Sequence, residues 1–147
     1  MRVSTLSILP GLLSAAKAAT FQDCGSTAND LQVSIAGCTD ANPACIFNTG
    51  QKASIKATFT SPVTIESAEI KITASVGIAS LNFPLSPAEA CGNWGLKCPA
   101  PAGSPQALMV EVPIDSSYPK IKVGVELQLV TSQGEKLICK SFPVEIK

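Results

Sequence analysis

Six cysteines are the residues of this 147-residue chain best suited to chemistry, and their number is even: Cys24, Cys38, Cys45, Cys91, Cys98 and Cys139. Free cysteines can act as nucleophiles or as metal ligands. However, the sequence contains no histidine and no C-x-x-C motif, which disfavours zinc sites and cysteine–histidine catalysis. The lack of histidine also excludes a serine–histidine–aspartate triad. We therefore expect three disulfides and no metal site.

The runs between the cysteines favour one of the fifteen possible pairings. Cys38 and Cys45 enclose the turn-forming run TDANPA, and the next two cysteines enclose the turn-rich run GNWGLK. Cys24 then remains for Cys139, and this bridge would tie the N-terminal end to the last strand. In the chain-entropy model each short loop contributes about 2.5 kcal/mol and the long loop about 5 kcal/mol.

The charged residues give no sign of an active site or of a nucleic-acid surface. The eleven acidic residues are scattered, so a paired-carboxylate glycosidase has little support. No glycine-rich phosphate loop occurs, and we expect neither a cofactor nor an enzymatic activity. Without its first 18 residues the chain has nine lysines, no arginine and a net charge of −2. Nucleic acid and strongly anionic membranes are therefore disfavoured as partners.

The first 18 residues have the pattern of a secretory signal peptide. Arg2 gives a short basic start, VSTLSILPGLL an apolar core, and AAKAA a small-x-small cleavage pattern. The alternative is a membrane anchor, but the apolar run is shorter than the ~18 residues that a spanning helix needs. We expect a signal peptide at residues 1–18 and a secreted, extracellular domain at residues 19–147.

Alternation of apolar and polar residues recurs along the rest of the chain and predicts an all-β fold. Runs with one apolar face cover 31–37, 53–60, 69–78, 107–114, 120–130 and 137–146. In the last run the apolar positions change parity between Cys139 and Phe142, which predicts a bulge near Ser141. Turn signals separate the runs and no helical periodicity appears. About seven short strands in one antiparallel sandwich are expected.

A proline-rich stretch, LNFPLSPAEACGNWGLKCP at residues 81–99, interrupts this alternation. Its apolar residues Leu81, Phe83 and Leu85 cannot be buried by a regular strand. The inward faces of the predicted strands are mostly aliphatic, and only seven residues of the chain are aromatic. Such sheets can pack into a dry core or enclose a smooth aliphatic pocket, and periodicity does not decide between the two.

The cysteines and their neighbours resemble one known family. The segments FQDCGS, VSIAGC, CIF, FPLSPAEAC, LKCPAPAG, VPIDSSYPKIKVGVELQL and LICKSFPVEI occur in this order. Together they resemble the Niemann–Pick C type 2 sterol-carrier family of the ML lipid-recognition superfamily, especially arthropod members, a group that includes the mite group 2 allergens. The resemblance covers Phe21 to Ile146. It implies an immunoglobulin-like sandwich of two antiparallel sheets, with one lipid in an apolar pocket between them.

The resemblance also implies disulfide pairs and site residues. The family pairs the first cysteine with the last, Cys38 with Cys45, and Cys91 with Cys98. Phe83 would lie at the pocket mouth with Ile114 and Tyr118, flanked by Val112, Pro113 and Ile121. The deeper wall would contain Val33, Ile35, Phe47, Phe59, Ile72, Val76 and Leu127. The proline-rich stretch would then form the lip of the pocket, stiffened by its prolines.

Purely structural interpretations also remain open for these residues. Phe83 can be a plain packing residue, Tyr118 a corner tyrosine of the sandwich, and the deep aliphatic residues ordinary core. Trp94 can be an exposed contact for a membrane or partner, or a cover on the core. Since the chain has no histidine, lipid affinity should change little between pH 5 and 7.

The sequence predicts a monomeric, secreted carrier that binds a sterol or a similar small hydrophobic lipid and transfers it without chemistry. A transient membrane or receptor contact would accompany the transfer. One alternative is a lipid-recognition protein of innate immunity, although only Lys97, Lys120 and Lys122 are candidates for a basic rim. Others are a carrier of fatty acids or semiochemicals and a solid-core adhesive sandwich without ligand.

Overall fold

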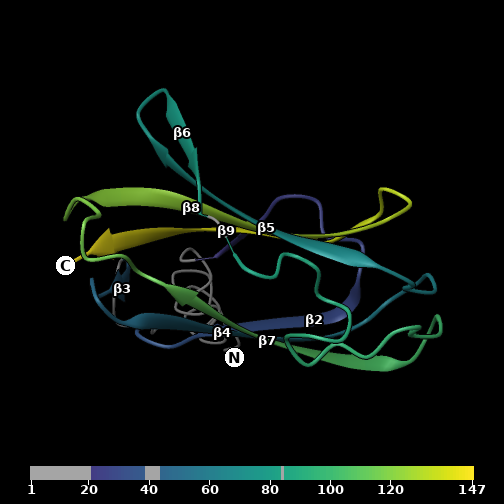
Figure 1. The fold of residues 1–147 in the computed structure, drawn as a ribbon. Helices are drawn as coiled ribbons and strands as arrows, with labels where there is room; N and C mark the ends of the chain where they lie inside the picture. Colours follow the sequence, from purple (N-terminus) through teal and green to yellow (C-terminus); the bar gives the residue numbers. More distant parts are fainter. Residues whose placement is uncertain (1–20, 39–43, 84) are drawn as a thin grey trace, which may run out of the picture.

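The computed structural model describes residues 21–38, 44–83 and 85–147, which form two β-sheets packed face to face (Figure 1). The strands are β1 (Gln22–Asp23), β2 (Asn29–Ile35), β3 (Cys45–Phe47), β4 (Lys52–Thr60), β5 (Ala68–Val76), β6 (Ala79–Asn82), β7 (Pro105–Pro113), β8 (Lys122–Thr131) and β9 (Lys136–Ile146). The described part of the chain contains no helix, and hence no helix able to cross a membrane. The all-β prediction is confirmed, whereas the predicted signal peptide lies outside the described residues.

The two sheets differ in size. The larger sheet has the order β1-β9-β8-β5-β6, and β3 adds to it by pairing in parallel with β9. The smaller sheet has the order β2-β4-β7. All other strand pairings are antiparallel. This is the expected antiparallel sandwich, with one parallel pairing added at its edge.

The core lies between the sheets and follows the predicted alternation. On β4 the residues Ala53, Ile55, Ala57 and Phe59 are buried while their neighbours face outward. Most inward residues of β5, β8 and β9 are buried as well, and Leu127 on β8 is 1% exposed. Each fully buried aliphatic side chain of this kind stabilises the fold by about 1.5–3 kcal/mol.

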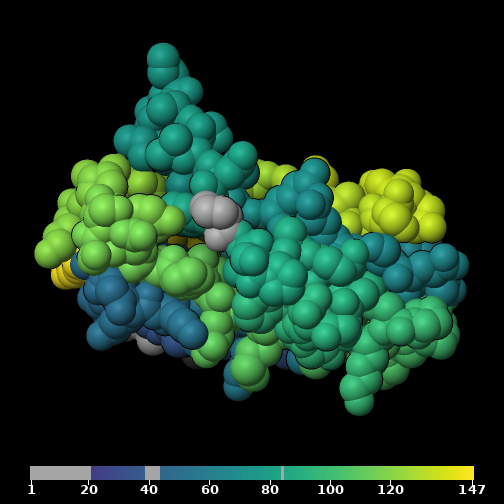
Figure 2. Space-filling model, viewed as in Figure 1, coloured from purple at the N-terminus to yellow at the C-terminus, as the bar shows by residue number. Residues whose placement is uncertain are grey.

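One predicted strand is shorter than expected, because the chain turns back on itself. The apolar face was expected to continue to Ile78, but β5 ends at Val76. Gly77 has a φ of 59°, which a glycine adopts without strain, and it forms the turn of a β5–β6 hairpin. The hairpin projects from the body of the sandwich (Figures 1 and 2), and Ile78 at its tip is fully exposed. The described residues therefore contain nine strands rather than about seven.

The bulge predicted near Ser141 is wrong. Ser141 pairs in register with Glu126, and the irregularity lies instead around Leu137, where Lys136 pairs with Val130. The apolar positions change parity for another reason. Both faces of β9 are covered in this region. The N-terminal segment pairs along the edge of β9, where its Ala28 amide donates to the carbonyl of Leu137 at 3.1 Å, and the Cys24–Cys139 disulfide covers Cys139.

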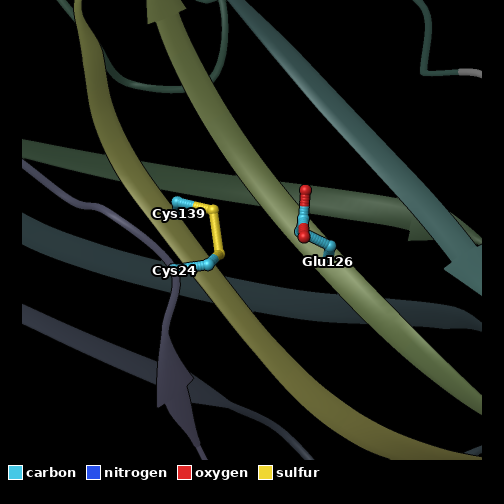
Figure 3. A group of neighbouring side chains, drawn as sticks. All are labelled: Cys24, Glu126 and Cys139. Carbon is cyan, nitrogen blue, oxygen red and sulfur yellow. A yellow bond between two sulfur atoms is a disulfide. The ribbon is translucent and has the colours of Figure 1, made fainter.

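All three predicted disulfides are present: Cys24–Cys139, Cys38–Cys45 and Cys91–Cys98. The first bridge joins residues 115 positions apart and holds the N-terminal segment against β9. Figure 3 shows Glu126 of β8 beside this bridge, and the three side chains lie close enough to suggest a metal site. Both sulfurs are already bonded to each other and so cannot act as thiolate ligands. The cluster is therefore a disulfide next to a carboxylate.

Candidate lipid-binding pocket

An apolar cavity of about 170 Å³ opens at the end of the sandwich from which the hairpin projects. Its lining comes from β5, β6, the loop before β8, and the ends of β8 and β9. The residues are Ala74, Val76, Leu81, Asn82, Phe83, Tyr118, Pro119, Ile121, Val123 and Ile146. They lie on strands of the larger sheet or on the β6–β7 and β7–β8 connections, which run between the two sheets. The smaller sheet contributes none of these ten residues, because its inward side chains fill the space between the sheets as core.

Two aromatic rings stack at this cavity. Phe83 and Tyr118 have ring centroids 5.5 Å apart and planes inclined by 17°. The Phe83 amide donates to the carbonyl of Ile72 on β5 at 2.8 Å, and the Tyr118 amide donates to the carbonyl of Asp115 at 3.0 Å. Both backbones are therefore fixed, one on a strand and the other in a turn. Both side chains are half-buried and pack against the core.

The structure brings four of the predicted site residues together and places the others elsewhere. Phe83, Tyr118, Ile121 and Val76 line the cavity. Seven others are buried in the core: Val112, Ile114, Ile35, Phe47, Phe59, Ile72 and Leu127. Val33 is half-buried and packs against that core, and Pro113 is exposed at the end of β7. A role in lipid binding stays a prediction for all thirteen.

Six lining residues were not predicted: Ala74, Leu81, Asn82, Pro119, Val123 and Ile146. Val123 and Ile146 have the inward parity of β8 and β9, so the alternation in the sequence could have indicated that they face the interior. Leu81 and Asn82 were missed because β6 has no alternating burial. All four of its residues are exposed, and only the hairpin turn places them at the cavity.

The lip after Phe83 is anchored on β5. The Ile70 amide donates to the carbonyl of Ala88 at 2.9 Å, and the Ala90 amide donates to the carbonyl of Ala68 at 2.8 Å. Between these bonds, the Glu89 carboxylate accepts from the Ser67 hydroxyl and from the Ala68 amide, the latter at 2.9 Å. The Ser67 hydrogen bond, followed by the backbone bonds, holds the pKa of Glu89 below its usual value.

Trp94 connects this lip to the smaller sheet. Its indole Nε1 donates to the carbonyl of Pro87 at 2.9 Å, and its own carbonyl accepts from the Met109 amide of β7 at 2.8 Å. The side chain is half-buried and packs against the core. Trp94 therefore links Pro87 of the lip to Met109 of β7.

Comparison with known proteins defines the class to which this fold and cavity belong. A family model described as the ML domain matches residues 18–146. The chain therefore belongs to the ML-domain family, as its sequence pattern indicated.

Individual relatives show which members of the family this chain is similar to. The chain is 31% identical to NPC intracellular cholesterol transporter 2 of Danio rerio over 127 residues, covering 86% of this chain and 83% of the relative. It is 30% identical to NPC intracellular cholesterol transporter 2 homolog a of Drosophila melanogaster over 133 residues, covering 90% of each protein. The chain thus groups with the Niemann–Pick C2 proteins.

A solved structure supports the fold. The crystal structure of a Niemann–Pick type C2 protein from the Japanese carpenter ant superimposes with a TM-score of 0.79 at 24% identity. The match covers 86% of this chain and 98% of the ant protein. The immunoglobulin-like sandwich expected from the sequence is thereby confirmed.

Proposed function

We propose that the protein is a soluble carrier that takes a sterol or a similar small lipid into the cavity and releases it unchanged. The observation that carries this proposal is the apolar cavity with the stacked Phe83 and Tyr118 rings. Membership of the ML-domain family and the likeness to proteins named cholesterol transporters support it. Burial of the lipid's apolar surface would supply about 25 cal/mol per Å².

The cavity also suits an amphiphile with one small polar group. Its lining is aliphatic and aromatic except for the Asn82 amide and the Tyr118 hydroxyl, which can hydrogen-bond a lipid hydroxyl. Its volume of about 170 Å³ is below the roughly 300 Å³ of a typical ligand site, so a sterol requires the walls to separate. β6 can supply that movement, because among the described strands it pairs with β5 alone.

A widened cavity would extend from the mouth into the space between the sheets. The predicted deep residues, such as Ile72 and Leu127, would then contact the lipid in addition to one another. Their burial in the core is compatible with the cavity as it stands and with the widened cavity. The lipid would replace core contacts rather than occupy a separate chamber.

The carrier function is tested by titration with the fluorescent sterol dehydroergosterol. We expect saturable binding at one site per chain, and competition by unlabelled cholesterol. Displacement by fatty acids but not by cholesterol would redirect the proposal to fatty-acid transport. A failure of both lipids to bind would contradict the proposal.

We further propose that the β5–β6 hairpin touches a membrane during transfer. Four apolar side chains beside the cavity are exposed: Val76 by 38%, Ile78 fully, Leu81 by 62% and Ile121 by 37%. The sequence from Ile72 to Ala88 contains no charged residue. Since three of these four side chains also line the cavity, a lipid leaving it would meet the bilayer directly.

The membrane contact is tested by the Ile78→Glu variant. Its rate of dehydroergosterol transfer to phosphatidylcholine vesicles should fall at least tenfold, while sterol affinity stays within twofold. Met109→Glu is the matched control, because Met109 is 48% exposed but lies on β7, away from the cavity. Equal transfer by both variants would contradict the contact.

Secretion and a monomeric state complete the proposal. The signal-peptide pattern of residues 1–18 supports export to the extracellular space. N-terminal sequencing of the protein from a culture medium should begin near Ala19. Sedimentation of the purified protein should give the mass of one chain.

A further inference from the structure

The first part of the lip is hydrogen-bonded to β5 at both of its ends. Phe83, directly after β6, still bonds to β5 through its amide and the carbonyl of Ile72, and Ala88 bonds to β5 again through its carbonyl and the amide of Ile70. These two β5 residues are only about 7 Å apart along the strand. The segment that follows Phe83 therefore begins and ends beside neighbouring positions of β5.

The Glu89 side chain holds the returning segment of the lip on β5. Its carboxylate accepts three hydrogen bonds, from the Ser67 hydroxyl, from the Ala68 amide at 2.9 Å and from the Cys91 amide at 3.1 Å. Two of the donors belong to the segment that begins β5, and the third belongs to the lip. Hydrogen bonds to an ionised acceptor are stronger than neutral ones. One side chain thus joins the returning lip to the start of β5.

We propose that Glu89 is a positioning residue for the pocket mouth, which holds the lip so that Phe83 stacks on Tyr118 and retains the bound lipid. This inference rests on the proposed carrier function. Glu89 itself does not line the cavity. It acts through the backbone of the lip, and its loss should speed lipid release.

The test compares Glu89→Gln with Glu69→Gln in the full chain. Glu69 is the matched control, because it pairs with Glu89 in a β-bridge but its own side chain is exposed and lies 4.0 Å from Lys71. Loss of the charged hydrogen bonds should raise the dissociation rate of dehydroergosterol roughly three- to tenfold. Glu69→Gln should leave that rate within twofold of the wild type.

A double-mutant cycle separates positioning from general destabilisation. If Glu89 acts through Phe83, adding Glu89→Gln to Phe83→Ala should change the dissociation rate by less than twofold. If Glu89 only stabilised the fold, Glu89→Gln would raise the dissociation rate by the same factor in the wild type and in Phe83→Ala. Additive effects, or an unchanged rate in Glu89→Gln alone, would overturn the proposal.

Amide hydrogen exchange tests the lip without any lipid. In Glu89→Gln the amides of Phe83 and Ala90 should exchange faster, whereas those of core strand β8 should not. Faster exchange with an unaltered dissociation rate would overturn the retention role while leaving the carrier function intact. If the wild type binds neither sterol nor fatty acid, the carrier function fails and the retention role fails with it. The exchange data then decide only whether Glu89 positions the lip.

Discussion

Phe83 on the β6–β7 connection and Tyr118 on the β7–β8 connection stack on each other at the cavity, with ring centroids 5.5 Å apart. A second aromatic pair, Phe21 and Phe142, has the same centroid distance but meets edge to face at 76°. Neither of these two residues lines the cavity. The chain therefore supplies a matched pair of aromatic contacts, one at the proposed site and one away from it.

Truncation of the stacked pair should weaken lipid binding. Phe83→Ala and Tyr118→Ala each remove an aromatic contact of about 0.5–1.5 kcal/mol, in addition to the apolar area that contacts the lipid. We expect dehydroergosterol affinity to fall about tenfold in each variant, as measured by fluorescence titration. Phe21→Ala should leave the affinity within twofold. A comparable loss in Phe21→Ala would contradict the assignment of the mouth.

A fully buried position and an exposed cavity-lining position should differ in their effect on stability. Leu127 is 1% exposed within the core, so Leu127→Ala should lower the free energy of unfolding by about 2–5 kcal/mol. Val76 is 38% exposed and lines the cavity, so Val76→Ala should cost little stability but weaken lipid binding. Urea denaturation and sterol titration of both variants measure the two effects. Equal stability losses in the two variants would contradict this division.

These two positions also show how far the sequence could predict the site. Val76 and Leu127 both have the inward parity of a strand, and alternation alone treats them as equivalent. They differ because β5 turns back after Val76, whereas Leu127 lies in the middle of β8, paired with β5 on one side and β9 on the other. The alternation predicted the sandwich, but the extent of each strand within it depends on a glycine turn and on pairing between distant segments.

The disulfides were predictable for a simpler reason. Two of them close short turn-rich loops, and the third follows once those are assigned. By contrast, the Glu89 contacts could not be predicted. They depend on the return of the lip to β5, and a single glutamate among eleven scattered acidic residues gives no pattern.

The long disulfide should contribute most to stability. Cys24–Cys139 joins residues 115 apart, and loops of that length reduce the entropy of the unfolded chain by an amount worth about 5 kcal/mol. The Cys24→Ala/Cys139→Ala variant should lose more unfolding free energy in urea than Cys91→Ala/Cys98→Ala, whose loop closes over seven positions. The reverse order would show that the lip disulfide supports more structure than its own loop.

Stability should fall in acid, partly through Glu89. Its folded-state pKa is lowered by the Ser67 hydrogen bond, so its contribution is complete above the unfolded value of about 4.3 and is lost as the pH falls through the folded value. Hydrogen bonds from Ser26 and Ser117 also lower the pKa of Asp23 and Asp115, so the comparison with Glu89→Gln isolates one group.

Thermal melts at pH 7, 5 and 3 measure this dependence. The wild type should melt at similar temperatures at pH 7 and 5 and at a lower temperature at pH 3. Glu89→Gln should melt below the wild type at pH 7 and 5, and the difference should narrow at pH 3. A constant difference across all three pH values would contradict the role of the ionised carboxylate.

Native mass spectrometry of the secreted, oxidised protein, followed by organic extraction of its ligand, tests the carrier function most directly. The carrier function predicts an adduct with the mass of a sterol or a similar lipid, bound at one molecule per chain and reduced in Phe83→Ala. A clean ligand-free mass, with no uptake after incubation with cholesterol or fatty acids, would contradict it and indicate a solid-core sandwich with another role.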